Sequence, residues 1–164
     1  MPGPVDNIFI QHINQNLGIA HKVSRIYFPD ADDREDVLQE MMYQLWRSYP
    51  RFDGHSKFST WMYSVCLNTA LTYRKKNKKE KTEPLSLVHH QVPEQFSTNK
   101  EEEINFLFDA IATLSPVNKA IMLLYLDDQG YDEIADITGL TKSNVSVKLV
   151  RIKKELEKLL KEKI

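Results

Sequence analysis

The chain has 164 residues, room for one domain or two small ones, and is 41% hydrophobic, 27% charged and 10% aromatic, like an ordinary globular protein. Five Gly and seven Pro are few for an all-β sandwich, so composition favours a helical protein. The longest apolar run, 120–126, is far shorter than the ~20 residues of a transmembrane helix, and the first residues lack a signal-peptide pattern. A single cysteine, Cys66, excludes an internal disulfide and a multi-cysteine zinc site, so we expect a reducing, cytoplasmic location.

The net charge of −1 conceals four blocks of charge along the chain. Residues 30–40 hold six acids and one arginine, and residues 74–81 hold six bases and one acid. Residues 104–141 hold six acids and one lysine, and residues 142–164 hold eight bases and three acids. The simplest interpretation of any one block is a solvated helix face. Two acidic blocks, each followed by a basic one, instead indicate two domains, each with a surface for a protein partner and another for phosphate.

In chain order, apolar residues at helical spacing first predict a helix over 10–27, ended by Pro29. A second helix is predicted from Asp32, with acids in its first turn where the helix dipole favours them, and Pro50 ends it.

A loop follows with a turn at Gly54, and Ser56 is expected to cap a third helix that runs into the basic block. The helical pattern then ends among prolines, histidines and polar residues, which predicts an extended linker over 81–102, with Glu101 and Glu102 at its end.

Helical spacing returns at Ile104 and predicts four helices to the end of the chain. Pro116 suits the first position of the second of them, and Gly130 is expected to end it. Residues 131–138 form a short third helix, and Thr141 is expected to cap the last one.

The strongest local signal is the spacing of Ala135, Gly139 and Val145, which is typical of a helix-turn-helix. Ala135 must be small where the second helix crosses, and Gly139 supplies the left-handed turn. Ile134 and Leu140 join Val145 in filling the wedge between the helices. The alternative is a plain antiparallel helix pair with a polar outer face.

The last helix carries, away from its core stripe, the hydroxyls, amide and cations that base edges and phosphates accept. These candidate DNA-binding residues are Lys142, Ser143, Asn144, Ser146, Val147, Lys148, Arg151 and Lys154. Val147 or the exposed neighbour Val150 would meet a thymine methyl group.

Two segments, DDREDVLQEMMYQLW (32–46) and FDGHSKFSTWMYSVCLNTALTYRKK (52–76), resemble region two of the bacterial RNA polymerase sigma factors of the extracytoplasmic-function (ECF) type. The segment 114–156, from LSPVNKAIMLLYL to VRIKKEL, resembles their region four. The resemblance implies an all-α protein with two small domains, 5–80 and 103–164, joined by a flexible linker.

The resemblance also implies a role for each charge block. Asp36, Gln39 and Glu40, which share one helix face, correspond to the surface that grips core RNA polymerase. The −10 promoter element would be held by an aromatic and polar loop and the helix after it: Phe52, Asp53, His55, Ser56, Lys57, Asn68, Thr72, Tyr73, Arg74 and Lys75. Trp61 is expected in the core, and the alternative for the basic run 74–81 is a solvated surface.

The chain departs from the family pattern at three residues of the last helix, Ser146, Lys148 and Val150, where many members have Lys, Arg and His. The resemblance therefore does not determine which −35 sequence the last helix reads. Cys66 stands where the family has a small residue, which indicates packing rather than redox sensing.

We therefore predict a transcription initiation factor that binds core RNA polymerase, helps to melt the −10 element and reads the −35 element. It is expected to be a monomer when free, without cofactor, metal or catalytic activity, and regulated by a separate partner such as an anti-sigma factor. One alternative is a dimeric helix-turn-helix repressor that binds duplex operator DNA. Another is an enzyme, for which only His89, His90 and Glu94 offer a conceivable metal site.

Overall fold

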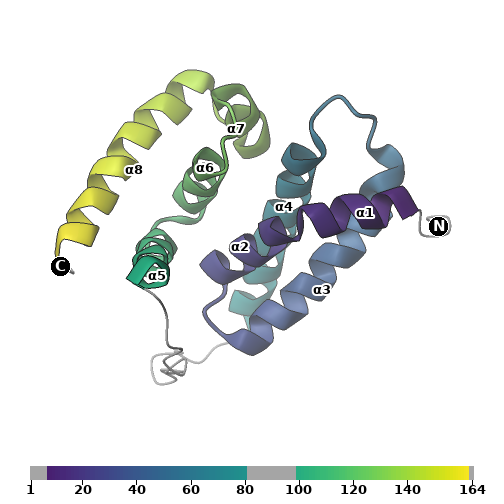
Figure 1. Ribbon diagram of the computed structural model, residues 1–164, viewed down its shortest axis with the longest axis horizontal. Helices are drawn as coiled ribbons and strands as arrows, with labels where there is room; N and C mark the ends of the chain where they lie inside the picture. Colours follow the sequence, from purple (N-terminus) through teal and green to yellow (C-terminus); the bar gives the residue numbers. More distant parts are fainter. Residues whose placement is uncertain (1–6, 81–98, 163–164) are drawn as a thin grey trace.

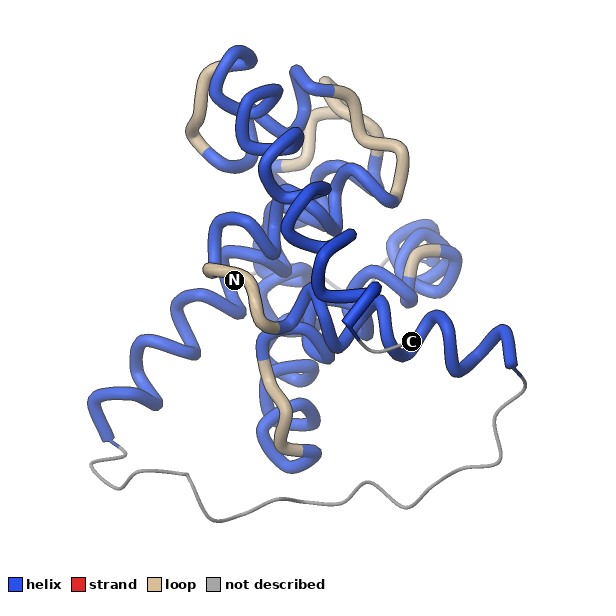
Figure 2. The backbone as a smooth tube through the Cα atoms, turned by 90° about the vertical axis from the view of Figure 1, so that its left-hand side faces the viewer, coloured by secondary structure: helices blue, strands red, loops and turns tan. Residues whose placement is uncertain are grey.

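The computed structural model describes residues 7–80 and 99–162, and all regular secondary structure in these two ranges is helical (Figures 1 and 2). The first range, here called the N-terminal domain, holds α1 (Asn7–Gln15), α2 (Leu17–Tyr27), α3 (Ala31–Ser48), the 3₁₀ helix η1 (Tyr49–Arg51) and α4 (Phe58–Glu80). The second, the C-terminal domain, holds α5 (Asn99–Ala112), α6 (Pro116–Leu126), α7 (Tyr131–Thr138) and α8 (Lys142–Glu162). The predicted all-α fold is confirmed, and most of the predicted linker lies outside the described residues.

The core of the N-terminal domain forms where α2, α3 and α4 pack against one another. On α3, Val37, Met41 and Leu45 recur every four residues and are completely buried. On α4, Met62 and Cys66 follow the same spacing and are also completely buried. Burial of a large apolar side chain is worth roughly 1.5–3 kcal/mol. This stripe therefore fixes the rotation of α3 and turns its acids outward.

The expected helix over 10–27 is two helices, because the chain breaks at Asn16. A continuous helix would offer the His12 carbonyl to the Asn16 backbone N–H. That carbonyl instead accepts from the Asn16 side-chain amide at 2.8 Å, and the Asn16 N–H donates to the Ile13 carbonyl at 3.1 Å. The prediction of one helix was wrong because a side-chain hydrogen bond overrides a hydrophobic period that continues through it.

The ends of the next helices depend on their caps. The Asp30 carboxylate accepts from the Asp32 N–H at 2.9 Å and starts α3, one residue before the predicted position. On α4, the Lys57 carbonyl accepts from the Trp61 N–H at 3.1 Å, so Lys57 occupies the N-cap position. The prediction of Ser56 as this cap was wrong by one residue.

The start of α6 is as predicted, but its end is not. Pro116 is the first residue of α6, and the Ser115 hydroxyl accepts from the Asn118 N–H at 3.3 Å. The helix ends at Leu126, whereas Gly130 has a φ of −70° and caps α7. Gly130 was expected to end α6, and that prediction was wrong.

Glu101 and Glu102 were predicted to end the linker, but they are helical. Helix α5 begins at Asn99, so Glu101 and Glu102 lie in its first turn, where the helix dipole stabilises negative charge.

The helix-turn-helix is confirmed in detail. Gly139 follows α7 with a φ of 77°, and its N–H donates to the Ala135 carbonyl at 2.9 Å. The Thr141 hydroxyl accepts from the Asn144 N–H at 3.1 Å and caps α8, and Val145 is completely buried. Helix α8 packs on α5, α6 and α7 and lies at the outer edge of the molecule, away from the N-terminal domain (Figure 1).

The two domains touch each other. Helix α2 packs against α5 and α6, and α4 packs against α6 and α7. Figure 1 shows α6 and α7 beside α4, with α2 passing close to α5. Across this contact the Asp127 carboxylate accepts from the Tyr63 hydroxyl at 2.6 Å, and the Pro116 carbonyl accepts from the Tyr27 hydroxyl at 2.6 Å.

Candidate polymerase and nucleic-acid interfaces

The acidic face of α3 is presented as the sequence predicts. Asp36 and Gln39 are exposed, and Glu40 is half-buried and accepts from the Gln44 side-chain amide at 2.9 Å. Tyr43 lies on the same face, seven residues after Asp36, and 49% of its surface is exposed. The sequence analysis did not assign Tyr43 to this face, although a spacing of seven residues keeps a side chain on one helix face.

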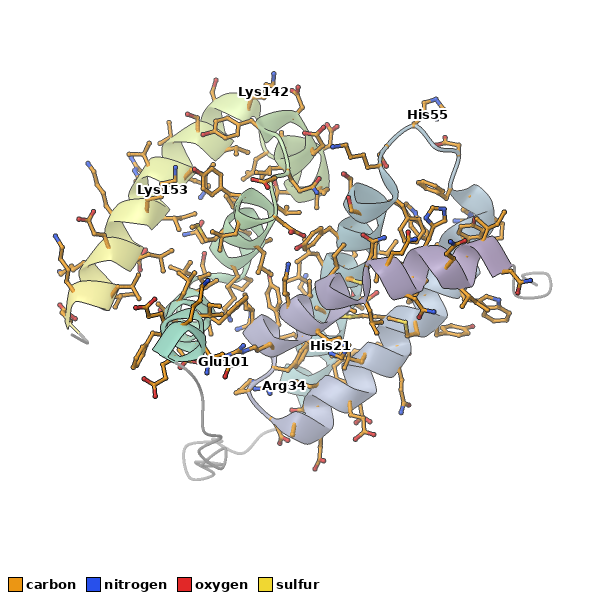
Figure 3. All side chains as sticks on the ribbon, in the orientation of Figure 1. His21, Arg34, His55, Glu101, Lys142 and Lys153 are labelled. Atoms are coloured by element: carbon orange, nitrogen blue, oxygen red, sulfur yellow. The ribbon has the colours of Figure 1, made fainter. Side chains whose placement is uncertain are left out.

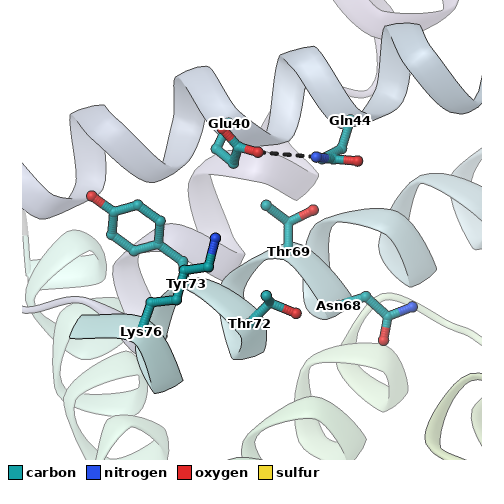
Figure 4. A pocket seen from close by; sticks show the side chains of 7 residues that line it. All are labelled: Glu40, Gln44, Asn68, Thr69, Thr72, Tyr73 and Lys76. Carbon is teal, nitrogen blue, oxygen red and sulfur yellow. Dashed lines mark hydrogen bonds between the residues drawn. The ribbon is translucent and has the colours of Figure 1, made fainter. Parts of the chain in front are cut away.

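A pocket of about 360 Å³ lies between α3 and α4 (Figure 4). Its lining is entirely polar or amphipathic: Glu40, Gln44, Asn68, Thr69, Thr72, Tyr73 and Lys76. The Tyr73 hydroxyl lies 3.5 Å from an Asp36 carboxylate oxygen, so the predicted polymerase face adjoins predicted DNA-binding residues. Asn68, Thr72 and Lys76 follow at intervals of four along α4, and this spacing could have predicted that Lys76 shares their face of the helix.

The loop between η1 and α4 is organised by Asp53. Its carboxylate accepts from the His55 backbone N–H at 3.0 Å and lies 2.8 Å from the His55 Nδ1. These hydrogen bonds lower the pKa of Asp53. His55, Ser56 and Lys57 are exposed, and Figure 3 shows His55 at the outer end of the loop. The loop therefore presents an imidazole, a hydroxyl and an ammonium group to solvent.

Phe52, at the base of this loop, belongs to an aromatic cluster. Its ring centroid lies 5.1 Å from that of Trp61 and 5.8 Å from that of Phe58. Helix α1 covers the cluster, since His12 stacks on Phe58 at 4.8 Å. Phe52 and Trp61 are each half-buried. The cluster thus holds the loop in place and leaves part of its aromatic surface open.

The basic end of α4 carries the remaining predicted residues for the −10 element. Asn68, Thr72 and Lys75 are exposed, whereas Tyr73 and Arg74 are half-buried. The Tyr73 ring meets the buried Phe28 edge-on at 5.7 Å. Tyr73 therefore anchors α4 as well as lining the pocket.

The outer face of α8 matches the predicted DNA-reading surface. Ser143, Val147, Arg151 and Lys154 are exposed, opposite the buried stripe of α8. Val147 and the neighbouring Val150 expose 50% and 53% of their surface. Asn144 is exposed, and Ser146 and Lys148 are half-buried, so these last two lie at the edge of the face.

Lys142 is placed differently from its predicted neighbours. Its ammonium group lies 2.7 Å from a carboxylate oxygen of Asp132 on α7, and this contact raises its pKa. Lys142 therefore joins the two helices of the helix-turn-helix at their exposed end, where it is labelled in Figure 3.

Comparison with known proteins identifies both domains. Residues 11–80 match sigma-70 region 2, and residues 107–156 match sigma-70 region 4. The chain is 29% identical over 144 residues to the ECF RNA polymerase sigma-E factor of Haemophilus influenzae, with 79% of this chain and 76% of that protein covered. It is 26% identical over 157 residues to the ECF RNA polymerase sigma factor SigM of Mycobacterium tuberculosis, with 94% and 76% covered. The chain belongs to the ECF sigma factors.

Solved structures share the fold of this sigma factor over nearly its whole length. The sigma factor RpoE of Bartonella quintana, in complex with the anti-sigma factor NepR, aligns with a TM-score of 0.75 at 20% identity, covering 95% of this chain and 98% of that one. CnrH, in complex with the cytosolic domain of CnrY, aligns with a TM-score of 0.66 at 17% identity, covering 94% and 88%. The family assignment makes core RNA polymerase and promoter DNA the partners of this sigma factor.

Cys66 of the sigma factor fits the predicted packing role. The side chain is completely buried, and burial raises the pKa of the thiol to about 12. The thiol is therefore protonated near neutral pH, whereas the thiolate is the reactive form.

Within residues 7–80 and 99–162, no group of three or more His, Cys, Asp or Glu side chains is arranged to hold a metal ion. His89, His90 and Glu94, the conceivable metal ligands, lie outside the described residues. No helix in the described ranges is long and apolar enough to cross a membrane.

Proposed function

We propose that this sigma factor divides promoter recognition between its domains. The N-terminal domain docks on core RNA polymerase through α3 and holds unpaired bases of the −10 element, and the C-terminal domain reads duplex DNA at the −35 element. The observation that carries the proposal is the outer face of α8. Ser143, Val147 and Arg151 recur there every four residues and are exposed, on a helix whose opposite side is buried in the core.

At the −35 element, α8 lies in the major groove, which admits one α-helix. Arg151 is placed to donate to a guanine edge, and Ser143 and Asn144 are placed to contact bases or phosphates at the start of the helix. Val147 and Val150 offer methyl groups, whose partner in the groove is the 5-methyl of thymine. Lys148 and Lys154 hold phosphates, and Ser146 contacts DNA from the edge of the face.

At the −10 element, single-stranded bases need stacking surfaces beside hydrogen-bonding groups. The aromatic cluster with Phe52 supplies the first, and Asp53, His55, Ser56 and Lys57 supply the second. Asn68, Thr72 and Tyr73 extend this surface into the pocket between α3 and α4. Arg74 and Lys75 contact the phosphates on either side.

On core polymerase, Asp36, Gln39 and Glu40 meet a basic or polar helical surface. Tyr43, exposed on the same face, adds the kind of aromatic anchor that dominates protein–protein interfaces. Because the similar structure of RpoE is a complex with the anti-sigma factor NepR, we include such a protein among the proposed partners. The polymerase catalyses RNA synthesis, so the sigma factor itself needs no catalytic residue or cofactor. The proposed location is the cytoplasm, where the polymerase works.

The experiment combines the purified sigma factor with bacterial core RNA polymerase and selects bound promoters from a random duplex library. The proposal predicts two enriched sequence elements at a fixed spacing. The variant Asp36→Arg should lose this selection, while Asp136→Arg, the same charge change at an exposed position of α7, should retain it. Enrichment of a single palindromic site, bound by free protein as a dimer, would support the repressor instead.

A further inference from the structure

The Phe58 ring, at the start of α4, is covered on one face by His12 of α1. The two ring centroids lie 4.8 Å apart and the ring planes differ by 20°, so the two rings are stacked. The other rings of the aromatic cluster meet Phe58 differently, since Phe52 is edge-on at 82° and Trp61 is tilted by 55°. Of these three rings, only that of His12 lies flat on Phe58.

A flat stack on an aromatic side chain is also how an unpaired nucleobase binds. The imidazole ring of His12 is smaller than a pyrimidine or a purine, so a base in the same place would cover more of the Phe58 ring. The face of Phe58 beneath His12 therefore has the chemistry of a base-stacking site, and a side chain of the protein itself fills it.

The groups around this face suit a nucleotide. Arg51 and Lys57, at the two ends of the loop that precedes α4, are exposed cations. His55 and Ser56, within the same loop, expose hydrogen-bonding groups. A base stacked on Phe58 would thus have cations near its phosphates and polar side chains near its edge.

Helix α1, which carries His12, is weakly held. Helices α2, α3 and α4 pack closely on one another, whereas α1 makes no comparably close packing with any of them. Its nine residues are fewer than the roughly 12–15 at which an isolated helix is marginally stable in water. Only Phe9 and Ile13 are buried, while Ile8 and Ile10 are exposed.

The position of α1 therefore depends on a few side-chain contacts. Besides the stack of His12 on Phe58, the Phe9 ring lies 4.7 Å from the Tyr49 ring. These contacts place α1 across the loop that precedes α4 (Figure 1). A short helix with few buried contacts leaves its place at a low free-energy cost.

We propose that the face of Phe58 beneath His12 is a stacking site for one unpaired base of the −10 element, and that His12 fills it until the DNA displaces it. This proposal deepens the proposed function and rests on it, because melted promoter DNA supplies the base. The exchange replaces one ring on Phe58 by another, so the aromatic cluster is covered in both states. The cost of moving α1 is subtracted from the affinity for the base.

The test measures binding of the holoenzyme, formed with core RNA polymerase, to a fluorescent single-stranded oligonucleotide that carries the selected −10 sequence. His12→Ala should raise the affinity several-fold, because the base no longer competes with the imidazole. His21→Ala, the same change at an exposed position of α2, should leave the affinity unchanged. Phe58→Leu keeps an apolar side chain but removes the ring, and it should lower the affinity about tenfold.

Abasic nucleotides show whether the ring and one particular base act together. Each base of the oligonucleotide is removed in turn, and the affinities of the unmodified and Phe58→Leu holoenzymes are compared. At the position that stacks on Phe58, removal of both base and ring should cost no more than removal of either one. His12→Ala should also lose its effect on that abasic oligonucleotide. A role of Phe58 in folding alone would not single out one base.

A further variant decides the question if Phe58→Leu fails to fold, as judged by circular dichroism. His12→Trp leaves Phe58 in place and covers it with a larger ring. The affinity for the intact oligonucleotide should then fall from His12→Ala, through the unmodified protein, to His12→Trp.

Equal affinities of the His12→Ala and His21→Ala holoenzymes would overturn the stacking site. So would a set of abasic oligonucleotides in which no position removes the effect of His12→Ala. In both cases binding of the intact oligonucleotide by the unmodified holoenzyme would show that the proposed function stands. Failure of the unmodified sigma factor to form a holoenzyme that binds this oligonucleotide would instead remove the proposed function, and the stacking site with it.

Discussion

The surfaces that we propose for DNA on the two domains differ in kind. The surface of the N-terminal domain is irregular: a loop ordered by Asp53 and an aromatic cluster around Phe52 lie at the start of α4, and a polar pocket lies further along that helix. The C-terminal domain offers one straight helical face on α8. An unpaired base needs a hollow and a stacking surface, whereas an intact duplex needs a rod that fits its groove. The difference indicates that one chain can bind melted DNA and paired DNA through separate domains, each with a surface suited to one of them.

The largest expected effect is the unfolding of the C-terminal domain while the N-terminal domain stays folded. Leu149 is buried at the centre of α8, and Leu149→Ala should cost about 2–5 kcal/mol of stability in the C-terminal domain. Both tryptophans, Trp46 and Trp61, lie in the N-terminal domain. Circular dichroism should therefore show an early helical transition that tryptophan fluorescence does not follow. A common shift of both signals would show that the domains fold as one unit.

The next largest effect is on the affinity for core polymerase, measured without DNA. Asp36→Arg should weaken binding to core polymerase by roughly 2–4 kcal/mol, as expected when a residue central to an interface is reversed in charge. Surface plasmon resonance with immobilised core would measure it, and the helix content should stay unchanged because Asp36 is exposed. Unchanged affinity would move the docking surface away from this face of α3.

Removal of a cation from α8 should affect paired DNA alone. Arg151→Ala should weaken holoenzyme binding to a duplex −35 element by about 1–3 kcal/mol if Arg151 reads a base. Binding to a single-stranded −10 oligonucleotide should not change, since that strand contacts the other domain. A small loss that is equal for all duplex sequences would make Arg151 a phosphate contact.

A smaller change sharpens the role of the exposed valines. Replacing thymine by uracil in the −35 element removes one methyl group and should cost about 0.8 kcal/mol at each position that meets Val147 or Val150. Val147→Ser, which has no methyl group, should abolish that sensitivity at its own position. If no uracil substitution changes the affinity, the valines do not read thymine.

The smallest expected effect is local to the loop of the N-terminal domain. Hydrogen bonds from His55 lower the pKa of the Asp53 carboxyl, so they stabilise the loop above the ordinary pKa of aspartate. This contribution is lost as the pH falls through the lowered pKa. An NMR titration should show the His55 amide resonance moving with the Asp53 carboxyl below that ordinary value. A carboxyl that titrates at its usual pH would contradict the hydrogen-bonded loop.

Local chemistry explains which parts of the fold could be predicted. The turn at Gly139 and the cap at Thr141 depend on a few adjacent residues, and the local sequence predicts both of them. The break at Asn16 arises because the His12 carbonyl accepts from the Asn16 side-chain amide and not from the Asn16 backbone N–H. A hydrophobic pattern does not distinguish these two donors. The Tyr63–Asp127 bond joins residues 64 positions apart, and it follows only from the packing of two domains.

The candidate sites show the same division. The outer face of α8 follows from helical periodicity, so the sequence predicted its exposed residues. The pocket needs two helices, and Gln44 and Thr69 joined it only once α3 and α4 were in place. Lys142 was predicted to belong to the DNA-binding face, but its ammonium group pairs with Asp132. That ion pair depends on the angle at which α7 and α8 meet, which the sequence does not give.

The most direct measurement is the migration of the purified chain with bacterial core RNA polymerase on a sizing column. The account predicts a stoichiometric complex at micromolar concentrations, and its loss in the Asp36→Arg variant. Absence of a complex, together with a dimer of the free protein, would contradict the division of promoter recognition between the two domains.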